Sequence, residues 1–125
     1  MKERKHPEQD LQEKIITLLR KKGRPDLAWT AIGNGDLRHP VVALRLQRMG
    51  VTAGAPDMIF ALDDGMTGWL ELKSATGRLS HEQQGFGVKL MKLGHLWAVA
   101  KSMEQAVTIL KDWNVFRANA DLGAR

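Results

Sequence analysis

Residues 50–73, GVTAGAPDMIFALDDGMTGWLELK, contain a glycine-rich loop followed by two strand-like segments and a tight turn between them. The first apolar segment, Met58 to Leu62, begins directly after Asp57. Asp63-Asp64-Gly65 is a typical reverse-turn sequence, so these two aspartates are expected to be turn residues and not metal ligands. The second segment, Trp69 to Lys73, alternates between apolar and polar residues. The stretch therefore predicts a β-hairpin.

The hairpin carries charged groups at positions where a buried sheet would normally be apolar. Alternation puts Glu71 and Lys73 on one face of the second strand and Leu70 and Leu72 on the other. Burying charge is costly unless it is paired or bound to a metal. Carboxylate oxygens, here from Asp57 and Glu71, suit Mg²⁺, and a nearby lysine stabilises charge that develops on a phosphate. The set predicts metal-assisted phosphodiester hydrolysis.

Length and composition favour one globular domain over residues 1–125, with its core over about 8–113 and a C-terminal tail over 114–125. The chain has 125 residues, of which 43% are hydrophobic, which is enough for one core but too few for two. The sequence has no apolar run that approaches the roughly 18 residues of a membrane span. No signal-peptide pattern follows the charged start MKERKHPEQD. No membrane partner is expected.

The net charge indicates the kind of binding partner, and the cysteine content indicates the redox compartment. The net charge of +5 and the pI near 9.8 favour a polyanionic partner. The absence of cysteine excludes disulfides and cysteine-ligated metal sites, and it fits a reducing cytoplasm.

The remaining apolar periodicity predicts an α/β fold in the order αβαββαβα. It has a mixed β-sheet of about four strands, with helices on both faces. Besides the hairpin, the expected elements are helices over about 7–22, 41–49, 81–93 and 103–113 and strands over 27–32 and 96–100.

The first predicted helix offers two glutamates to a site on the sheet. At about 100° per residue, Glu8 lies in line with Ile15 and Leu19 on the stripe that faces the sheet, whereas Glu13 falls about 140° away. Glu8 is thus the better candidate for a metal ligand. The alternative is that Glu8 only favours the dipole of its own helix.

Gln83 has a structural and a functional explanation. Ser80-His81-Glu82-Gln83 reads as a capping box, with Ser80 at the N-cap and Gln83 at the third helical position. Gln83 could also bind the substrate or a metal-bound water.

Four basic residues are candidates for DNA binding. Arg45 and Arg48 lie in the helix predicted over 41–49. One interpretation is that they contact DNA phosphates, and the other is that they form a solvated face of this helix. Arg78 precedes the capping box, and Lys89 lies in the helix that follows it.

Taken in order, the motifs resemble the VRR-NUC family, a virus-type replication–repair branch of the PD-(D/E)xK nuclease superfamily. The resemblance covers about residues 8 to 112. It rests on the helical Glu8, Arg48-x-Gly50-Val51, Gly54-x-Pro56-Asp57, Glu71-x-Lys73, Gly77-Arg78-Leu79-Ser80 and Glu82-Gln83.

The resemblance implies a restriction-endonuclease-like core with a metal site. By match, Mg²⁺ or Mn²⁺ is bound by Glu8, Asp57 and Glu71, with the main-chain carbonyl of Leu72 as a further ligand. Lys73 is then catalytic. Gln83 corresponds to the glutamine that the family carries in the helix after the hairpin.

The resemblance also implies a substrate and an assembly. Small stand-alone members are similar to bacterial or phage proteins that act as homodimers on branched DNA such as Holliday junctions. This predicts a cytoplasmic, structure-selective DNA endonuclease. The alternatives are a non-catalytic DNA-binding module on the same fold and a nuclease that acts on flaps or structured RNA.

Overall fold

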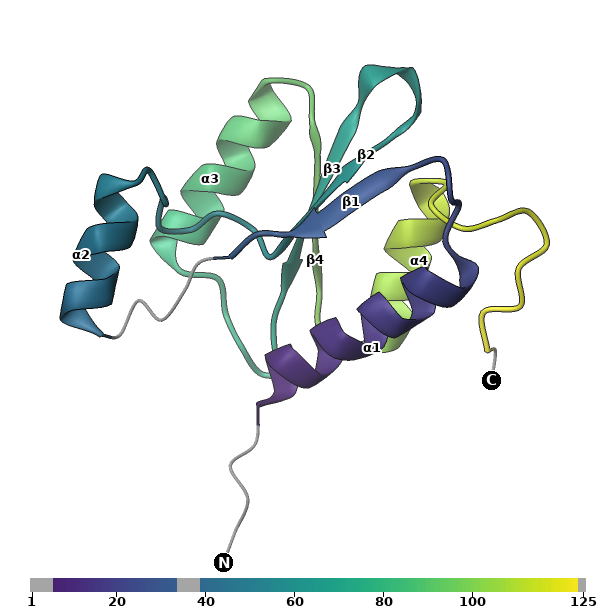
Figure 1. The fold of residues 1–125 in the computed structure, drawn as a ribbon, viewed down its shortest axis with the longest axis horizontal. Coiled ribbons are helices and arrows are strands. Elements are labelled where there is room, and N and C mark those ends of the chain that lie inside the picture. The colour runs from purple at the N-terminus through teal and green to yellow at the C-terminus, as the bar shows by residue number, and fades with distance from the viewer. Residues whose placement is uncertain (1–5, 34–38, 124–125) are drawn as a thin grey trace, which may run out of the picture.

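A mixed sheet of four strands lies at the centre of the protein (Figure 1). The computed structural model describes residues 6–33 and 39–123. The strands are ordered β1-β2-β3-β4, and β1–β2 and β2–β3 pair antiparallel whereas β3–β4 pair parallel. Their bounds are Ala28–Ala31 for β1, Met58–Ala61 for β2, Thr67–Leu72 for β3 and Leu96–Ala100 for β4.

Helices cover both faces of this sheet, which confirms the predicted α/β class and the order αβαββαβα. The helices are α1 (Pro7–Lys22), α2 (Pro40–Arg48), α3 (His81–Lys92) and α4 (Met103–Asp112). In Figure 1, α1 and α4 lie together on one side of the sheet, α3 lies on the other, and α2 stands apart. Within the part of the chain that the structure describes, no helix is both long and apolar enough to cross a membrane.

Apolar side chains at alternate positions of the β2–β3 hairpin form the centre of the main core. Met58, Phe60, Leu70 and Leu72 are at most 1% exposed, because every second side chain of β2 and β3 points to the same face. The apolar stripes of α1 and α4 pack against them, with Leu11, Ile15, Leu19, Ala106 and Leu110. The intervening side chains of β3, among them Glu71, therefore belong to the opposite face.

The predicted end of the core at residue 113 is wrong. Val115 and Phe116 are 1% and 7% exposed and belong to the core cluster. Asn114 has a φ of 58°, which reverses the chain after α4. The backbone N–H of Arg24 then donates to the Val115 carbonyl at 2.8 Å. Two apolar residues after a helix carry no periodic signal, so the sequence pattern could not assign them to the core.

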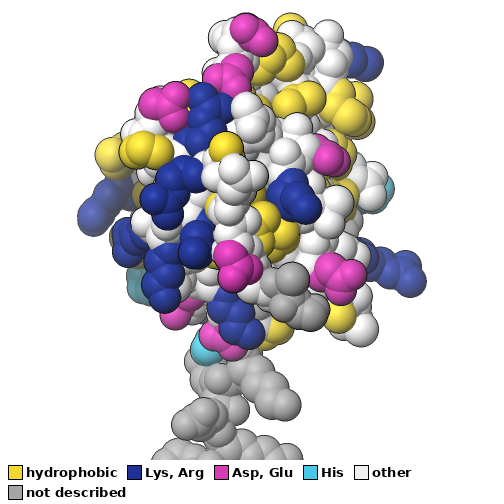
Figure 2. Space-filling model, turned by 90° about the vertical axis from the view of Figure 1, so that its right-hand side faces the viewer, with side chains coloured by type: hydrophobic (Ala, Val, Ile, Leu, Met, Phe, Trp, Pro, Cys, Tyr) yellow, Lys and Arg dark blue, Asp and Glu magenta, His cyan; other side chains and the backbone are white. Residues whose placement is uncertain are grey.

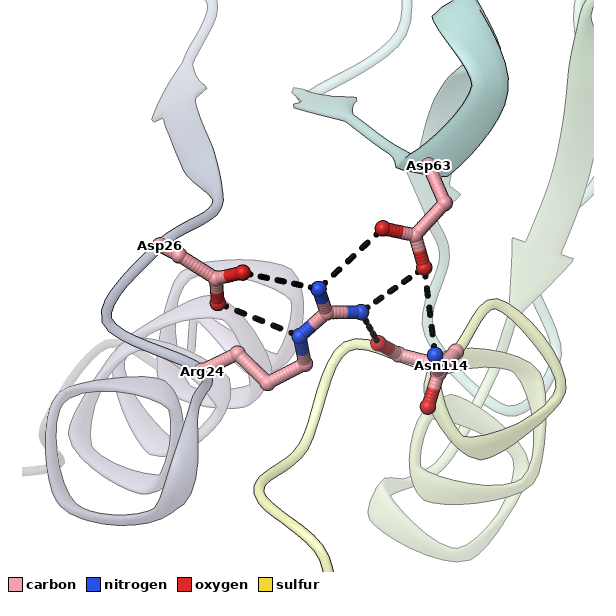
Figure 3. A network of polar contacts seen from close by, with 4 residues as sticks. All are labelled: Arg24, Asp26, Asp63 and Asn114. Carbon is pink, nitrogen blue, oxygen red and sulfur yellow. Dashed lines mark hydrogen bonds and ion pairs between the residues drawn. The ribbon is translucent and has the colours of Figure 1, made fainter.

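Arg24 joins three segments that are distant in sequence (Figure 3). Its guanidinium donates to the carboxylates of Asp26 and Asp63, at 2.9 and 2.8 Å for the shortest pairs, and to the carbonyl of Asn114 at 3.1 Å. These hydrogen bonds hold the pKa of both carboxyl groups below the ordinary range. Asp63 thus has a structural partner at the hairpin turn, as expected for a turn residue, and the network fixes the end of the molecule opposite the site described below.

Candidate metal-dependent active site

The hairpin fixes Asp57 to the backbone of β3. The Asp57 N–H donates to the Leu70 carbonyl at 3.0 Å, and its carbonyl accepts from Ile32 at 2.8 Å. One carboxylate oxygen accepts from the backbone N–H of Leu72 at 2.7 Å. This side chain is half-buried and lies beside the strand that carries Glu71.

Among residues 6–33 and 39–123, Glu71 is the charged residue that is buried, with 3% of its surface exposed, and it lies on the sheet face opposite the main core. Its Oε2 accepts a hydrogen bond from the side-chain amide of Gln83 at 3.2 Å. Its Oε1 is buried and has no hydrogen-bond partner. An unsatisfied oxygen of this kind costs free energy unless another group binds it.

Gln83 has the capping role that the sequence predicts, and its side chain also contacts Glu71. Its Oε1 accepts from the backbone N–H of Ser80 at 2.8 Å, and the Ser80 hydroxyl accepts from the Gln83 N–H at 3.1 Å. This is a complete capping box. Because the same side chain also donates to Glu71, it connects the N-terminus of α3 to the buried carboxylate.

The surroundings of Glu71 disfavour its charge. Burial, followed by the negative charge of Asp57, raises its pKa to about 9. Lys73 opposes this shift, and Glu8 adds to it. The negative charges of Asp57 and Glu8 and the positive charge of Lys73 thus all influence the Glu71 carboxyl group. This excess of negative charge and the free Oε1 fit a divalent cation, which prefers hard oxygen ligands.

The structure brings Glu8, and not Glu13, to this site. Glu8 lies in the first turn of α1, is exposed, and lines a shallow concave surface together with Ser74, the residue after Lys73. Glu13 is exposed and accepts a hydrogen bond from Gln9 at 3.0 Å, on the outer side of α1.

The carboxylates do not form a complete cage. Among residues 6–33 and 39–123, no three His, Asp or Glu side chains are grouped as a metal site. Asp57 and Glu71 lie together, whereas Glu8 belongs to another element, α1.

The four basic candidates lie on three elements around the site. Arg45 and Arg48 are exposed on α2, Arg78 is exposed in the connection between β3 and α3, and Lys89 is exposed on α3.

Gly54 is a positioning residue that motif reading alone did not explain. It has a φ of +90°, and a Cβ added there would lie 2.3 Å from the backbone oxygen of Glu82. The loop before Asp57 is therefore seated directly on the N-terminus of α3. The signal in the sequence was only a glycine two residues before Pro56.

Trp69 has a packing role on the same strand face as Glu71. Its ring centroid lies 5.9 Å from that of Phe86. Its indole N–H donates to the Thr67 hydroxyl at 2.9 Å, which in turn lies 2.7 Å from Nδ1 of His95. Trp69 thus packs on α3 and, through Thr67, connects β3 to His95, the residue before β4.

Comparisons with known proteins agree with this architecture. No family model matches the chain, and no curated protein matches it. A solved structure described as a VRR_NUC domain protein superposes with a TM-score of 0.72 at 19% sequence identity. The match covers 89% of this chain and 90% of that one. The chain therefore has the fold of a VRR-NUC domain protein, the fold that its motifs resemble.

Proposed function

We propose that this protein is a divalent-metal-dependent endonuclease that hydrolyses phosphodiester bonds of branched DNA. The observation that carries the proposal is the buried Glu71, whose Oε1 has no partner and whose neighbours are Asp57 and Lys73. A protein that only binds DNA has no reason to place carboxylates where phosphates approach. The VRR-NUC fold supports the same chemistry.

Each residue of the site then has a role. Asp57, Glu71, Glu8 and the main-chain carbonyl of Leu72 would hold Mg²⁺ or Mn²⁺. When bound, such an ion lowers the pKa of a water and offsets charge on the phosphate.

The chain's own residues prepare the site around these ligands. The amide of Gln83 orients the Glu71 carboxylate, and the Leu72 N–H orients that of Asp57. Lys73 stabilises negative charge as it develops on the scissile phosphate.

The charge distribution supports a nucleic-acid substrate. The net charge is +5, and Figure 2 shows a band of Lys and Arg side chains, with acidic side chains beside it, on the face that forms the right-hand side of Figure 1. Such a surface attracts DNA backbones without reading sequence. Arg45, Arg48, Arg78 and Lys89 are exposed and are proposed to contact phosphates nearer the site.

The resemblance supports a finer proposal: a Holliday-junction-type resolvase that acts as a homodimer in the cytoplasm of a bacterium or a phage-infected cell. A twofold dimer presents two active sites to two strands related by a similar axis. Sedimentation equilibrium of the full chain tests the dimer, with a mass of twice 14.0 kDa expected.

The enzymatic proposal is tested by cleavage of labelled four-way junction, flap, linear duplex and structured RNA. Each substrate is incubated with Mg²⁺, Mn²⁺ or EDTA. We expect metal-dependent cutting, fastest on the junction, and a loss of about 10³-fold or more in Asp57→Asn because a metal ligand is removed. Tight binding without cutting of any substrate would instead support a binding module.

A further inference from the structure

Helix α2 is amphipathic but does not pack into the core. None of its residues is buried, and Figure 1 shows it standing apart from the sheet and the other helices. Val41 and Leu44 are 64% and 50% exposed, and Met49, its C-cap residue, is 74% exposed. Short helices are stabilised mainly by packing of an apolar face, so a ligand that covers these side chains would stabilise α2.

The exposed face of α2 mixes apolar and basic side chains. Val42, Ala43 and Leu46 are half-buried toward the protein. At about 100° per residue, the outward arc of roughly 140° contains Leu44, Arg48, Val41, Arg45 and Met49 in that order. From His39 to Pro56 the sequence has no acidic residue.

The end of α2 is connected to the active site through ordered backbone. Gly50 has a φ of +94°, and the N–H groups of Gly50 and Val51 return to the carbonyls of Gln47 and Leu46 at 3.0 and 2.9 Å. This is a Schellman motif. The loop then seats Gly54 on the N-terminus of α3, three residues before Asp57. A ligand held on α2 is therefore held at a defined place relative to the site.

The charges of this face favour DNA over a second copy of the chain. In a twofold interface through α2, the arginines would lie against the same arginine-bearing face of the partner helix, which offers no carboxylate. DNA offers phosphates for the arginines. Where base stacking is interrupted at a branch, it also offers apolar base and sugar surface for Leu, Met and Val side chains.

We propose that α2 is the element that selects branched DNA. Arg45 and Arg48 contact phosphates, and Leu44 and Met49 pack on bases exposed at the branch point. This deepens the proposed nuclease function and rests on it. Arginine contacts alone would bind any duplex, so the apolar side chains are the part that distinguishes a junction.

The test compares two double variants that are matched in residue type and exposure. Leu44→Gln/Met49→Gln changes α2, where these side chains are 50% and 74% exposed. Met91→Gln/Leu93→Gln changes the C-terminal end of α3, where the exposures are 50% and 76%. Dissociation constants are measured by fluorescence anisotropy in EDTA, for a four-way junction with 2-aminopurine at its centre and for a linear duplex. Unfolding midpoints confirm that both variants are folded.

We expect the α2 double variant to lose about tenfold in junction affinity. Its ratio of junction to duplex affinity should fall, and 2-aminopurine fluorescence should no longer rise on binding. The α3 double variant should behave as wild type. Arg45→Ala/Arg48→Ala should weaken both DNAs together and reduce the salt slope by about 2.

The inference would be overturned if the ratio of junction to duplex affinity were unchanged in the α2 glutamine variant. It would also be overturned if this ratio fell equally in the α2 and α3 glutamine variants. Conversion of a dimer to a monomer by the α2 changes in sedimentation would overturn it as well, because α2 would then be a protein interface. If wild type cuts the junction while the ratio is unchanged in the α2 variant, only this inference fails. If wild type binds neither DNA, the proposed function fails with it.

Discussion

Replacing Glu71 with Gln is expected to stabilise the metal-free protein. The variant keeps the shape of the side chain and removes a carboxyl group that is 3% exposed and whose pKa is raised to about 9 by burial and by Asp57. At pH 7 the unfolded chain carries this group ionised, whereas the folded protein must protonate it. Folding of the wild type therefore carries a cost that the variant does not have.

The size of this effect follows from the pKa difference. From the ordinary value of 4.5 to pH 7, at about 1.4 kcal/mol per pH unit, the upper limit is about 3.5 kcal/mol. Relaxation and water entry reduce it to about 1–2 kcal/mol. For a chain of 125 residues this raises the unfolding midpoint by about 4–8 °C.

The assay is thermal unfolding in EDTA over a range of pH, with Glu13→Gln as the exposed control. Below about pH 4.5 the carboxyl group is neutral in both states, so wild type and Glu71→Gln should unfold together. The gap should grow as pH rises toward about 9, because only the unfolded wild type releases the proton. Glu13→Gln should follow the wild type at every pH.

Adding metal should reverse the order of the two unfolding midpoints, so that the wild type becomes more stable than Glu71→Gln. At 100 times its dissociation constant, Mg²⁺ or Mn²⁺ should stabilise the wild type by about 2.7 kcal/mol, or about 10 °C, and Glu71→Gln by much less. A lower midpoint for Glu71→Gln in EDTA, or a gap that does not depend on pH, would refute the reasoning about this carboxylate.

Three further predictions test the scaffold. Gly87→Ala should lower the free energy of unfolding by about 1–3 kcal/mol, because a Cβ there would lie 2.2 Å from the ring of Trp97. The control is Gly85→Ala in the same helix, where an added Cβ meets nothing within 4 Å. This control should raise the free energy of unfolding by about 0.5–1 kcal/mol. Arg24→Ala should lower the unfolding midpoint at neutral pH, and the difference from wild type should vanish in acid as its two carboxylate partners, whose pKa values it depresses, become protonated. Gln83→Leu should lose about 1 kcal/mol of stability through the helix cap and also lower the cleavage rate, whereas an effect on stability alone would assign it a purely structural role.

The hairpin and the order of the elements could be predicted because their signals are local. Met58 to Leu72 alternates with a turn between two apolar segments, and α1 begins at Pro7 and ends at Lys22 as its periodicity predicts. The placement of Glu71 on the face of β3 opposite Leu70 and Leu72 followed from the same alternation. The helical wheel favours Glu8 over Glu13 as a metal ligand, and this stays a prediction.

What the sequence could not show depends on contacts between distant segments. The burial of Val115 and Phe116 requires the end of α1 beside them. The backbone of Gly54 packs closely against the backbone at the N-terminus of α3, and a pattern of side chains cannot predict such a contact. The sequence predicted α2 from its apolar residues, but it gave no sign that this face remains exposed.

The measurement that tests the central claim most directly is single-turnover cleavage of a four-way junction in Mg²⁺ by wild type, Glu71→Gln and Glu13→Gln, with binding measured in parallel in EDTA. We predict that all three proteins bind the junction, that wild type and Glu13→Gln cut it, and that Glu71→Gln is slower by about 10³-fold or more. Cutting by Glu71→Gln at the wild-type rate would contradict the claim that this buried carboxylate is the centre of a metal-dependent nuclease.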